Sequence, residues 1–286
     1  MRCSQIHTVP TPATPDTSTP AGALTTTVAE LGPLAARFAI EWVDSCASTN
    51  SSLMEHPPAD DGKVHVLVAE RQSAGRGRRG RQWQSWAEGS LTFSLLWRFA
   101  PGAPVPAGLS LVAGLAVART IEQLGVLGVQ LKWPNDVLVN GEKLAGILVE
   151  LLPARDRSLS AVIGIGINLQ LPPDAHIEHH AGVTDLMRAL EHTPPSRPAL
   201  LARLLAELQA LLDTYALAGF PALRGAWEQR NAFAELPVRI SGERDASDGI
   251  CLGVDENGAL LLRTSDGVTR ILAGDVSLRP LGGERT

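Results

Sequence analysis

The sequence predicts an α+β protein with two structured domains. Short apolar runs such as Val64–Glu70 and Ala161–Asn168 have the length and composition of buried strands. Between such runs lie longer segments whose apolar residues recur at helical spacing, and after Pro237 the chain changes to short strands separated by turn residues. With 286 residues and 44% apolar content, the chain can bury a sizeable core.

Three parts are expected along the chain. Residues 1–34 are predicted to be a disordered tail, because the first 30 hold eight Thr and four Pro and little apolar surface to offset the entropy of ordering. Residues 35–235 carry the mixed strand and helix patterns of a globular domain. Residues 236–286 are expected to form a small all-β unit.

The first elements of the globular domain follow from local patterns. Phe38–Val43 reads as a strand, and the polar run Ser48–Ser52 predicts the start of a short helix, because hydroxyl and amide side chains accept from the free N–H groups there. Val64–Glu70 is apolar enough to be a central strand. Leu91–Phe99 is predicted to be a third strand.

The second half of this domain has clear signals for where helices, strands and turns begin and end. A core helix is expected from Pro106 to Gly125, because its apolar residues recur at helical spacing. Asn140-Gly141 between two apolar runs predicts a tight hairpin. Ser196 and Gly219 bracket a long leucine-rich helix. In the strand Ala161–Asn168, glycines recur at every second position, so one face lacks side chains and another group can lie against it.

Arginines and glycines alternate between Glu70 and Trp86, although the protein has a net charge of -5 and a pI near 5.8. The guanidinium fork matches a carboxylate or a phosphate, and glycine lets the backbone approach a ligand. The segment therefore predicts an anion-binding loop. Its arginines are Arg71, Arg76, Arg78, Arg79 and Arg81, and its glycines are Gly75, Gly77 and Gly80.

Four other interpretations of this segment are weaker. A dinucleotide fingerprint needs a helix at the loop and an acidic residue about 20 positions later, and neither is present in the pattern. A phosphate loop needs Lys-Ser/Thr where the chain has Arg81-Gln82. A nucleic-acid patch with stacking tryptophans conflicts with the acidic net charge. A solvated surface loop is the remaining alternative.

Composition also limits the kind of site. Cys3, Cys46 and Cys251 lie far apart, so neither a disulfide framework nor a cysteine zinc site is indicated. His176, His179 and His180 lack carboxylate or cysteine partners in the pattern and are interpreted as loop histidines, so no dedicated metal site is expected. The scattered cysteines predict a reducing, cytoplasmic setting, and the longest apolar stretch is too short to span a bilayer, so we expect no membrane partner.

Four motifs occur in order along the chain: Ser48-Thr49-Asn50, the loop Gln72–Gly80, Lys132-Trp133-Pro134-Asn135-Asp136, and Lys143–Glu150. Together they closely resemble those of the biotin protein ligases, also called biotin-[acetyl-CoA-carboxylase] ligases. The likeness extends from about Glu41 to the C-terminus. It implies a mixed sheet flanked by helices, related to lipoate ligases and class II aminoacyl-tRNA synthetases, followed by an SH3-like β-barrel.

The resemblance implies a two-step reaction. ATP and biotin first form biotinyl-5'-AMP and pyrophosphate, with Mg²⁺ accompanying ATP, and the biotinyl group then passes to one lysine of a biotin carboxyl carrier protein. Bringing a carboxylate to the α-phosphorus places like charges together, so cationic groups must stabilise the transition state.

The resemblance also assigns residues. Biotin contacts are expected from Ser48, Thr49, Asn50, Gln72, Gly75, Arg76, Gly77, Arg78, Lys143 and Gly146. ATP or adenylate contacts are expected from Arg76, Arg78, Arg79, Trp83, Lys132, Asn135, Lys143 and Asn168. Arg78, Lys143 and Asp136 are the candidate catalytic residues.

Individual roles are hypotheses with simpler alternatives. Ser48–Asn50 can cap a helix as well as bind a ligand. Lys143 has the alternative of a solvated strand end, and Trp83 has that of plain core burial in place of packing on adenine. Asp136 is a candidate base for the acceptor lysine, or a group that assists the metal. If Arg78 retains the adenylate, Arg78→Gly should release it and label lysines indiscriminately.

Two rival functions share this fold. A lipoate ligase uses the same chemistry on another acid, and a biotin-sensing regulator binds DNA through an extra N-terminal winged helix. The first 30 residues lack the helical patterns of such a module, so we expect a ligase that binds no DNA. The acceptor protein, the affinity for biotin, the role of the C-terminal unit and the presence of a homodimer are open at this stage.

Overall fold

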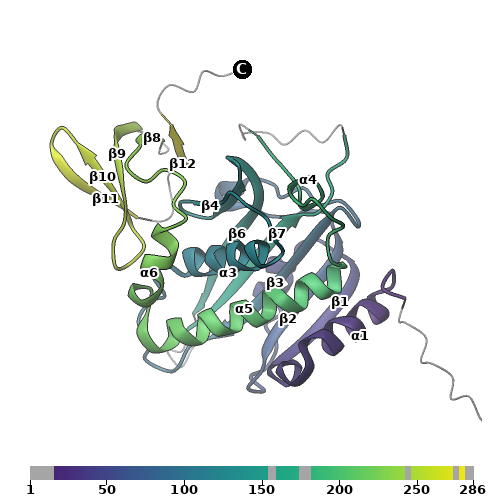
Figure 1. Ribbon diagram of the computed structural model, residues 1–286. Coiled ribbons are helices and arrows are strands. Elements are labelled where there is room, and N and C mark those ends of the chain that lie inside the picture. The colour runs from purple at the N-terminus through teal and green to yellow at the C-terminus, as the bar shows by residue number, and fades with distance from the viewer. Residues whose placement is uncertain (1–15, 154–158, 174–181, 242–245, 273–276, 281–286) are drawn as a thin grey trace, which may run out of the picture.

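The computed structural model describes residues 16–153, 159–173, 182–241, 246–272 and 277–280. Within these ranges the chain forms a seven-stranded mixed sheet with helices on it, and a separate five-stranded sheet near the C-terminus (Figure 1). The predicted α+β class is therefore confirmed. The predicted boundary at residues 235 and 236 falls between the last helix and the first strand of the second sheet.

The large sheet has the order β1-β2-β3-β7-β6-β5-β4. Only β1 and β2, which are joined through the short helix α2, pair in parallel, and the other neighbours are antiparallel. Its elements are β1 (Phe38–Cys46), α2 (Thr49–Glu55), β2 (Val64–Gln72), β3 (Ser90–Arg98), β4 (Val129–Lys132), β5 (Asp136–Val139), β6 (Glu142–Pro153) and β7 (Leu159–Asn168).

One face of this sheet carries the main core. Helices α1 (Pro20–Leu31), α3 (Leu109–Gln123) and α5 (Arg197–Ala218) cover it (Figure 1). Successive strand residues alternate between the faces, so Val66 and Val68 join this core while Leu67 packs in a smaller cluster beside α2. The opposite face is therefore less covered, and the motifs described above meet on that side. A short helix, α4 (Leu186–Ala189), follows β7.

Helix α1 overturns part of the predicted disordered tail. Its side chains Ala23, Thr27 and Leu31 recur at intervals of four and are all buried, and the helix packs on α5 and β1. The tail prediction was wrong for residues 20–34, because one narrow stripe of small and apolar residues suffices when a leucine-rich helix receives it. A short 3₁₀ helix (Gly32–Arg37) then leads into β1. Residues 1–15 lie outside the described residues.

The hairpin prediction is confirmed and one helix boundary changes. Asn140 and Gly141 both have positive φ values of 50° and 85° between β5 and β6, as the two central residues of this turn type require. Helix α5 has its N-cap at Ser196 and its C-cap at Gly219, as predicted. Helix α3 begins at Leu109, not at Pro106, because Gly108 has a φ of 73°, which is left-handed and incompatible with a helix.

The C-terminal sheet joins the large domain through its turns. Its strands are β8 (Pro237–Ser241), β9 (Ala246–Val254), β10 (Leu260–Thr264), β11 (Gly267–Ile271) and β12 (Ser277–Pro280), in the order β11-β10-β9-β8-β12. Helix α6 (Pro221–Glu228) lies beside it, and Glu228 accepts a hydrogen bond from the backbone N–H of Val254 at 2.6 Å. Nε1 of Trp133 donates to the carbonyl oxygen of Gly258 at 3.0 Å, so this sheet contacts the Lys132–Asp136 motif directly.

Candidate functional site

A cavity of about 460 Å³ lies between the large sheet and the loop Gln72–Gln84, which we call the arginine loop. Its walls come from α2, the arginine loop and the strands β3 to β7. The cavity thus brings together four motifs that are up to about 100 residues apart in the chain. The predicted residues that line it are Ser48, Thr49, Asn50, Gln72, Arg76, Gly77, Arg78, Arg79, Trp83, Lys132, Asn135, Asp136, Lys143, Gly146 and Asn168.

Strand register builds the floor of this cavity from small and polar side chains. Thr92 of β3 lies opposite Gly166 of β7, and Gly166 lies opposite Gly146 of β6. Two residues along the strands, Ser94 lies opposite Gly164. Alternate residues of a strand share a face, so both rows lie on the face of the sheet that bears the cavity. The floor has room for larger groups to lie flat upon it.

Two side chains occupy the space that the glycines leave. A Cβ atom at Gly166 would stand 2.2 Å from Cε2 of Trp83, and one at Gly164 would stand 2.0 Å from Oδ1 of Asn50. The prediction that another group lies against the glycine-bearing strand is thus confirmed. The ring of Trp83 lies against Gly166 and Gly146 and lines the cavity, which suits it for stacking on a planar ligand.

The start of α2 is both a helix cap and a cavity wall. Oγ of Ser48 accepts a hydrogen bond from the backbone N–H of Ser51 at 3.4 Å, so Ser48 caps the helix. The backbone N–H of Thr49 donates to Oε1 of Gln72 at 2.7 Å, and Oγ1 of Thr49 lies 2.6 Å from Oγ of Ser94. These contacts tie the helix to β2 and β3 at the cavity edge.

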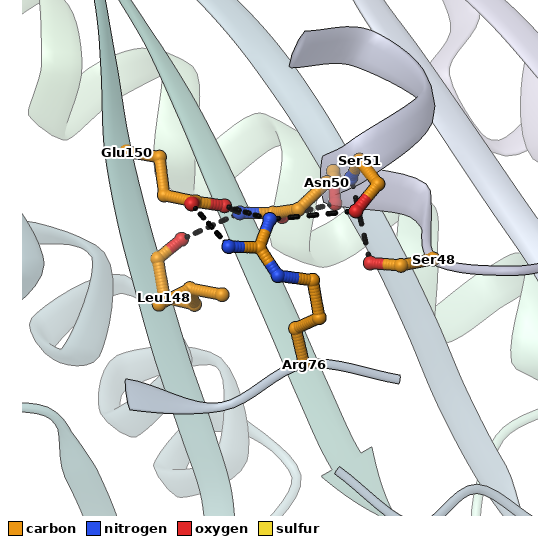
Figure 2. Close-up of polar contacts among 7 residues, drawn as sticks. Ser48, Asn50, Ser51, Arg76, Leu148 and Glu150 are labelled. Atoms are coloured by element: carbon orange, nitrogen blue, oxygen red, sulfur yellow. Dashed lines mark hydrogen bonds and ion pairs between the residues drawn. The ribbon is translucent and has the colours of Figure 1, made fainter. Parts of the chain in front are cut away.

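Asn50 is held by a buried network that ends at a carboxylate. Its Oδ1 accepts from the hydroxyl of Ser94 at 2.6 Å, and its Nδ2 donates to the carbonyl of Leu148 at 3.3 Å and to Oε2 of Glu150 at 3.0 Å. The guanidinium of Arg76 approaches the same carboxylate from the arginine loop (Figure 2). Asn50 is 3% exposed, so its amide orientation is set by this network.

The arginine loop is a narrow ribbon closed by a tight turn. The backbone N–H of Gly77 donates to the carbonyl of Arg81 at 2.7 Å, and Arg79 and Gly80 at the tip have φ values of 59° and 70°. Only a single 3₁₀ turn, Arg78–Gly80, forms there. The dinucleotide interpretation, which requires a helix at this point, is therefore wrong.

Gly75 is the one predicted site residue that does not line the main cavity. It borders a smaller cavity of about 270 Å³ behind the loop, and its carbonyl accepts from the N–H of Trp83 at 2.9 Å. A Cβ atom at Gly75 would stand 2.3 Å from the carbonyl oxygen of Trp83. The glycine is thus required by the close approach of the two arms of the loop, a role that its position in a ligand motif did not indicate.

Cationic groups gather at one side of the cavity. Nζ of Lys143 lies 2.7 Å from Oδ1 of Asp136 and 5.9 Å from the ring centre of Trp83. Nη1 of Arg78 donates to Oδ1 of Asn135 at 3.2 Å. The side chain of Lys143 is 13% exposed, so its interpretation as a solvated strand end was wrong. Lysine and arginine charges at a partly enclosed site attract and orient anions strongly.

Polar atoms without protein partners also face the cavity. Within the described part of the chain, Nε1 of Trp83, Oγ1 of Thr92 and Oδ1 of Asn168 are buried and have no hydrogen-bond partner. The Nδ2 atom of Asn168 is occupied, because it donates to the carbonyl of Thr184 at 3.0 Å. Buried polar groups are normally satisfied, so such atoms in a cavity wall fit a site that receives a polar ligand.

The sequence interpretation did not single out Thr92, which lines the cavity, or Ser94 and Glu150, which hold Asn50. A signal for the first two was present, because Ser90, Thr92 and Ser94 are polar at every second position of an otherwise apolar strand, and all three are buried. No local pattern marks Glu150, at the end of its motif, as a partner of Arg76.

Other chemistries find little support in the described residues. Within them, no group of three or more His, Cys, Asp or Glu side chains is arranged to hold a metal ion, and His176, His179 and His180 lie outside them. Burial raises the pKa of the thiols of Cys46 and Cys251, which keeps them protonated at neutral pH. No helix in this part of the chain has the length and apolarity needed to cross a membrane.

Family patterns match both domains. The Biotin/lipoate A/B protein ligase family matches residues 42–168, and the Biotin protein ligase C terminal domain matches residues 237–279. The first range contains all four motifs and every strand of the large sheet except the start of β1. The second contains most of the five-stranded sheet.

Individual relatives agree with the family patterns. The chain is 38% identical over 239 residues to a Biotin--[acetyl-CoA-carboxylase] ligase of Paracoccus denitrificans, which covers 80% of this chain and 96% of that protein. It is 38% identical to the Bifunctional ligase/repressor BirA of Escherichia coli over 75% of this chain, but this spans only 66% of the bifunctional relative.

Among solved structures, the biotin protein ligase of Aquifex aeolicus in complex with biotin and ATP has a TM-score of 0.71 and 31% identity, covering 84% of this chain and 98% of that one. A fold of this extent, the ordered motifs and the near-complete match to the Paracoccus protein all agree. The chain therefore belongs to the biotin protein ligase family.

Proposed function

We propose that this protein is a biotin-[acetyl-CoA-carboxylase] ligase, which activates biotin with ATP and transfers it to a lysine of a biotin carboxyl carrier protein. The observation that carries this proposal is the cavity itself, in which a floor of small and polar residues meets a cationic side with Arg78 and Lys143. Its volume of about 460 Å³ lies within the range of ordinary ligand pockets.

The first step would join two anions. A carboxylate oxygen of biotin attacks the α-phosphorus of ATP, the bond to the bridging oxygen breaks, and pyrophosphate leaves with the electron pair. The repulsion between the carboxylate and the phosphates must be offset before they meet. Lys143 and Arg78, which face the same cavity, supply fixed positive charge for this purpose, and Trp83 offers a flat surface to the adenine.

The second step would consume the mixed anhydride. The lysine amine of the carrier attacks the acyl carbon, AMP leaves, and the extra proton of the amine passes to a base. A lysine amine has a pKa of about 10.4 in isolation, so a nearby carboxylate is useful. Asp136 lines the cavity beside Lys143 and is the candidate for this role.

Magnesium fits the site as a companion of ATP. Mg²⁺ is commonly held by one or two carboxylates together with substrate phosphates, and Asp136 offers one carboxylate in the cavity wall. When bound, the ion would neutralise phosphate charge. The protein groups that bind and orient the reactants act without a metal site that is built from protein ligands alone.

Retention of the adenylate is assigned to the arginine loop. Arg78 of the loop donates to Asn135, and both residues line the cavity, which supports a loop that closes over the bound intermediate. Arg78→Gly would remove this contact. Release of biotinyl-5'-AMP and labelling of exposed lysines on unrelated proteins are then expected, and unchanged retention of the adenylate would contradict this role.

The decisive test uses the purified chain with ATP, Mg²⁺, biotin and a biotin carboxyl carrier domain. Mass spectrometry should find one added biotinyl group on the target lysine. A carrier in which that lysine is replaced by arginine should remain unlabelled, and Lys143→Met should reduce labelling by about a hundredfold or more, since removing one electrostatic stabiliser of a transition state commonly does so.

An assay with lipoate in place of biotin distinguishes the proposed function from that of a lipoate ligase. Labelling with lipoate but not with biotin would replace the proposal by a lipoate ligase, and absence of any labelling would overturn it. The repressor activity in the name of the Escherichia coli relative is not part of this proposal.

A further inference from the structure

We propose that Glu150 is a positioning residue that latches the arginine loop shut by holding Arg76, and that it couples this closure to the start of α2 through Asn50. The inference rests on the proposed function only for the ligand that the closed loop retains. The latch itself is a property of the protein and can be measured without any substrate.

The geometry around the Glu150 carboxylate is specific. Arg76 donates from Nη2 to Oε1 at 2.8 Å and from Nη1 to Oε2 at 3.0 Å, which is a two-pronged contact (Figure 2). Paired guanidinium and carboxylate groups in this arrangement are stronger and more directional than a single ion contact. A lysine at position 76 could not reproduce the fork.

The same carboxylate also holds the start of α2, which forms a wall of the cavity. Oε2 of Glu150 also accepts from Nδ2 of Asn50 at 3.0 Å, and Nη1 of Arg76 lies 3.4 Å from the hydroxyl of Ser51 (Figure 2). Glu150 belongs to β6, Asn50 and Ser51 to the first turn of α2, and Arg76 to the arginine loop. Three separate segments therefore meet at one side chain.

Burial indicates which partner of the ion pair is fixed and which one can move with the loop. Asn50 is 3% exposed and its carbonyl oxygen is already held by Ser94, so it cannot follow Arg76 if the loop moves away. The side chain of Glu150 is 21% exposed and that of Arg76 is 46% exposed. Glu150 is thus the fixed half of the pair, anchored to the sheet and to Asn50, and Arg76 is the half that can leave with the loop.

Closure at this point bears on the ligand. The arginine loop forms one wall of the cavity, and through Arg76 it contacts Ser51 at the start of α2 and Glu150 of β6 (Figure 2). Through Arg78 the loop makes a second contact, with Asn135. With both contacts made, a ligand that fills the cavity has to wait for the loop to open before it leaves. Loss of the Glu150 contact should therefore speed dissociation without altering the reacting groups.

Hydrogen exchange of the loop amides, measured by mass spectrometry on a peptide that covers residues 76–83, tests the latch in the absence of ligand. Glu150→Gln should raise the exchange rate about fivefold, the change expected for a partly exposed ion pair. Arg76→Met should raise it by a similar factor. The double variant should show no further increase, because both changes remove the same contact. Raising the salt concentration should reduce the difference from the unaltered protein.

Asp248→Asn is the matched control. Asp248 forms an equally two-pronged contact with Arg239, at 2.7 Å for each prong, in the C-terminal sheet, whose described residues do not line the cavity. This variant should leave loop exchange unchanged. Unchanged exchange in Glu150→Gln, or effects that simply add in the double variant, would overturn the latch.

A second measurement addresses the ligand. The rate at which biotinyl-5'-AMP leaves the protein should rise about fivefold in Glu150→Gln, while the rate constant of adenylate formation at saturating substrates stays unchanged in this variant. A general structural defect would also change the rate constant of adenylate formation and would shift the melting temperature. Faster hydrogen exchange of the loop with an unchanged dissociation rate of biotinyl-5'-AMP would support the latch but overturn its role in retaining the adenylate. A chain that makes no adenylate at all would refute the proposed function, and the exchange data would still decide the latch.

Discussion

The ammonium group of Lys143 lies 2.7 Å from the carboxylate of Asp136, and both side chains are mostly buried, at 13% and 10% exposure. The two residues stand on the neighbouring strands β6 and β5, on either side of the tight turn at Asn140-Gly141. A group proposed to act on the first step is thus paired with a group proposed to act on the second. The charge of each stabilises the charge of the other, because both side chains are largely shielded from solvent.

Asp136→Asn is therefore expected to lower the rates of both steps of the reaction. The amide keeps the size of the side chain but removes a negative charge that orients Lys143. We expect adenylate formation to fall about tenfold, which corresponds to about 1.4 kcal/mol, and transfer to the carrier to fall further. Pyrophosphate exchange measures the first step, and single-turnover transfer of preformed adenylate measures the second. Loss of transfer with normal pyrophosphate exchange would show that the ion pair does not matter for activation.

Gly164→Ala should be strongly destabilising. A Cβ atom there would stand 2.0 Å from Oδ1 of Asn50, whose amide is fixed by Ser94 and Glu150. Displacing this buried network should cost about 1–3 kcal/mol in the free energy of unfolding. Chemical denaturation measures the change.

The matched substitution is Gly225→Ala in helix α6, where nothing lies within 4 Å of the added atom. It should stabilise the protein by about 0.5–1 kcal/mol, because alanine favours the helix more than glycine does. Equal effects of the two substitutions would contradict the proposed crowding at the cavity floor.

Gly258→Ala should loosen the contact between the C-terminal sheet and the large domain. Gly258 has a φ of 75°, and a Cβ atom would stand 2.8 Å from Cα of Gly108 while the carbonyl of Gly258 holds Nε1 of Trp133. Hydrogen exchange should rise in residues 246–271 and in the Lys132–Asp136 motif together. Gly125→Ala controls for backbone strain alone, because Gly125 has a φ of 93° with open space around it. A rise in hydrogen exchange confined to the C-terminal sheet would show that this sheet and the Lys132–Asp136 motif are not coupled.

Stability at high pH should depend on Tyr215. Burial raises the pKa of this phenol to about 12, and its hydroxyl donates to the carbonyl of Ala107 at 2.8 Å. The unfolded chain releases this proton near pH 10, so the stabilisation is complete below about pH 10 and declines towards pH 12 by about 1.4 kcal/mol per pH unit. Urea unfolding at several pH values measures this slope. Tyr215→Phe should flatten it, and an unchanged slope would mean that another group is responsible.

Much of the site could be predicted from the sequence because its residues sit in short motifs. The glycine spacing of β7 predicted a bare strand face, and Asn140-Gly141 predicted the turn before Lys143; both follow from local backbone chemistry. The alternating Ser90, Thr92 and Ser94 carried the same kind of signal for the cavity floor. The helix at residues 20–31 could not be predicted in this way, because its stability depends on a partner helix about 180 residues away.

The amino-acid sequence by itself determined the strands and the longer helices of residues 35–235, where the tight turns lie and which residues carry charge to the cavity. Only the tertiary structure decided that Glu150 meets Arg76, that Trp83 lies on Gly166, and that Lys143 meets Asp136. The physical reason is that local propensity acts over a few residues, whereas strand register and loop closure join side chains that are far apart along the chain. Such contacts exist only once the sheet has fixed which residues face one another.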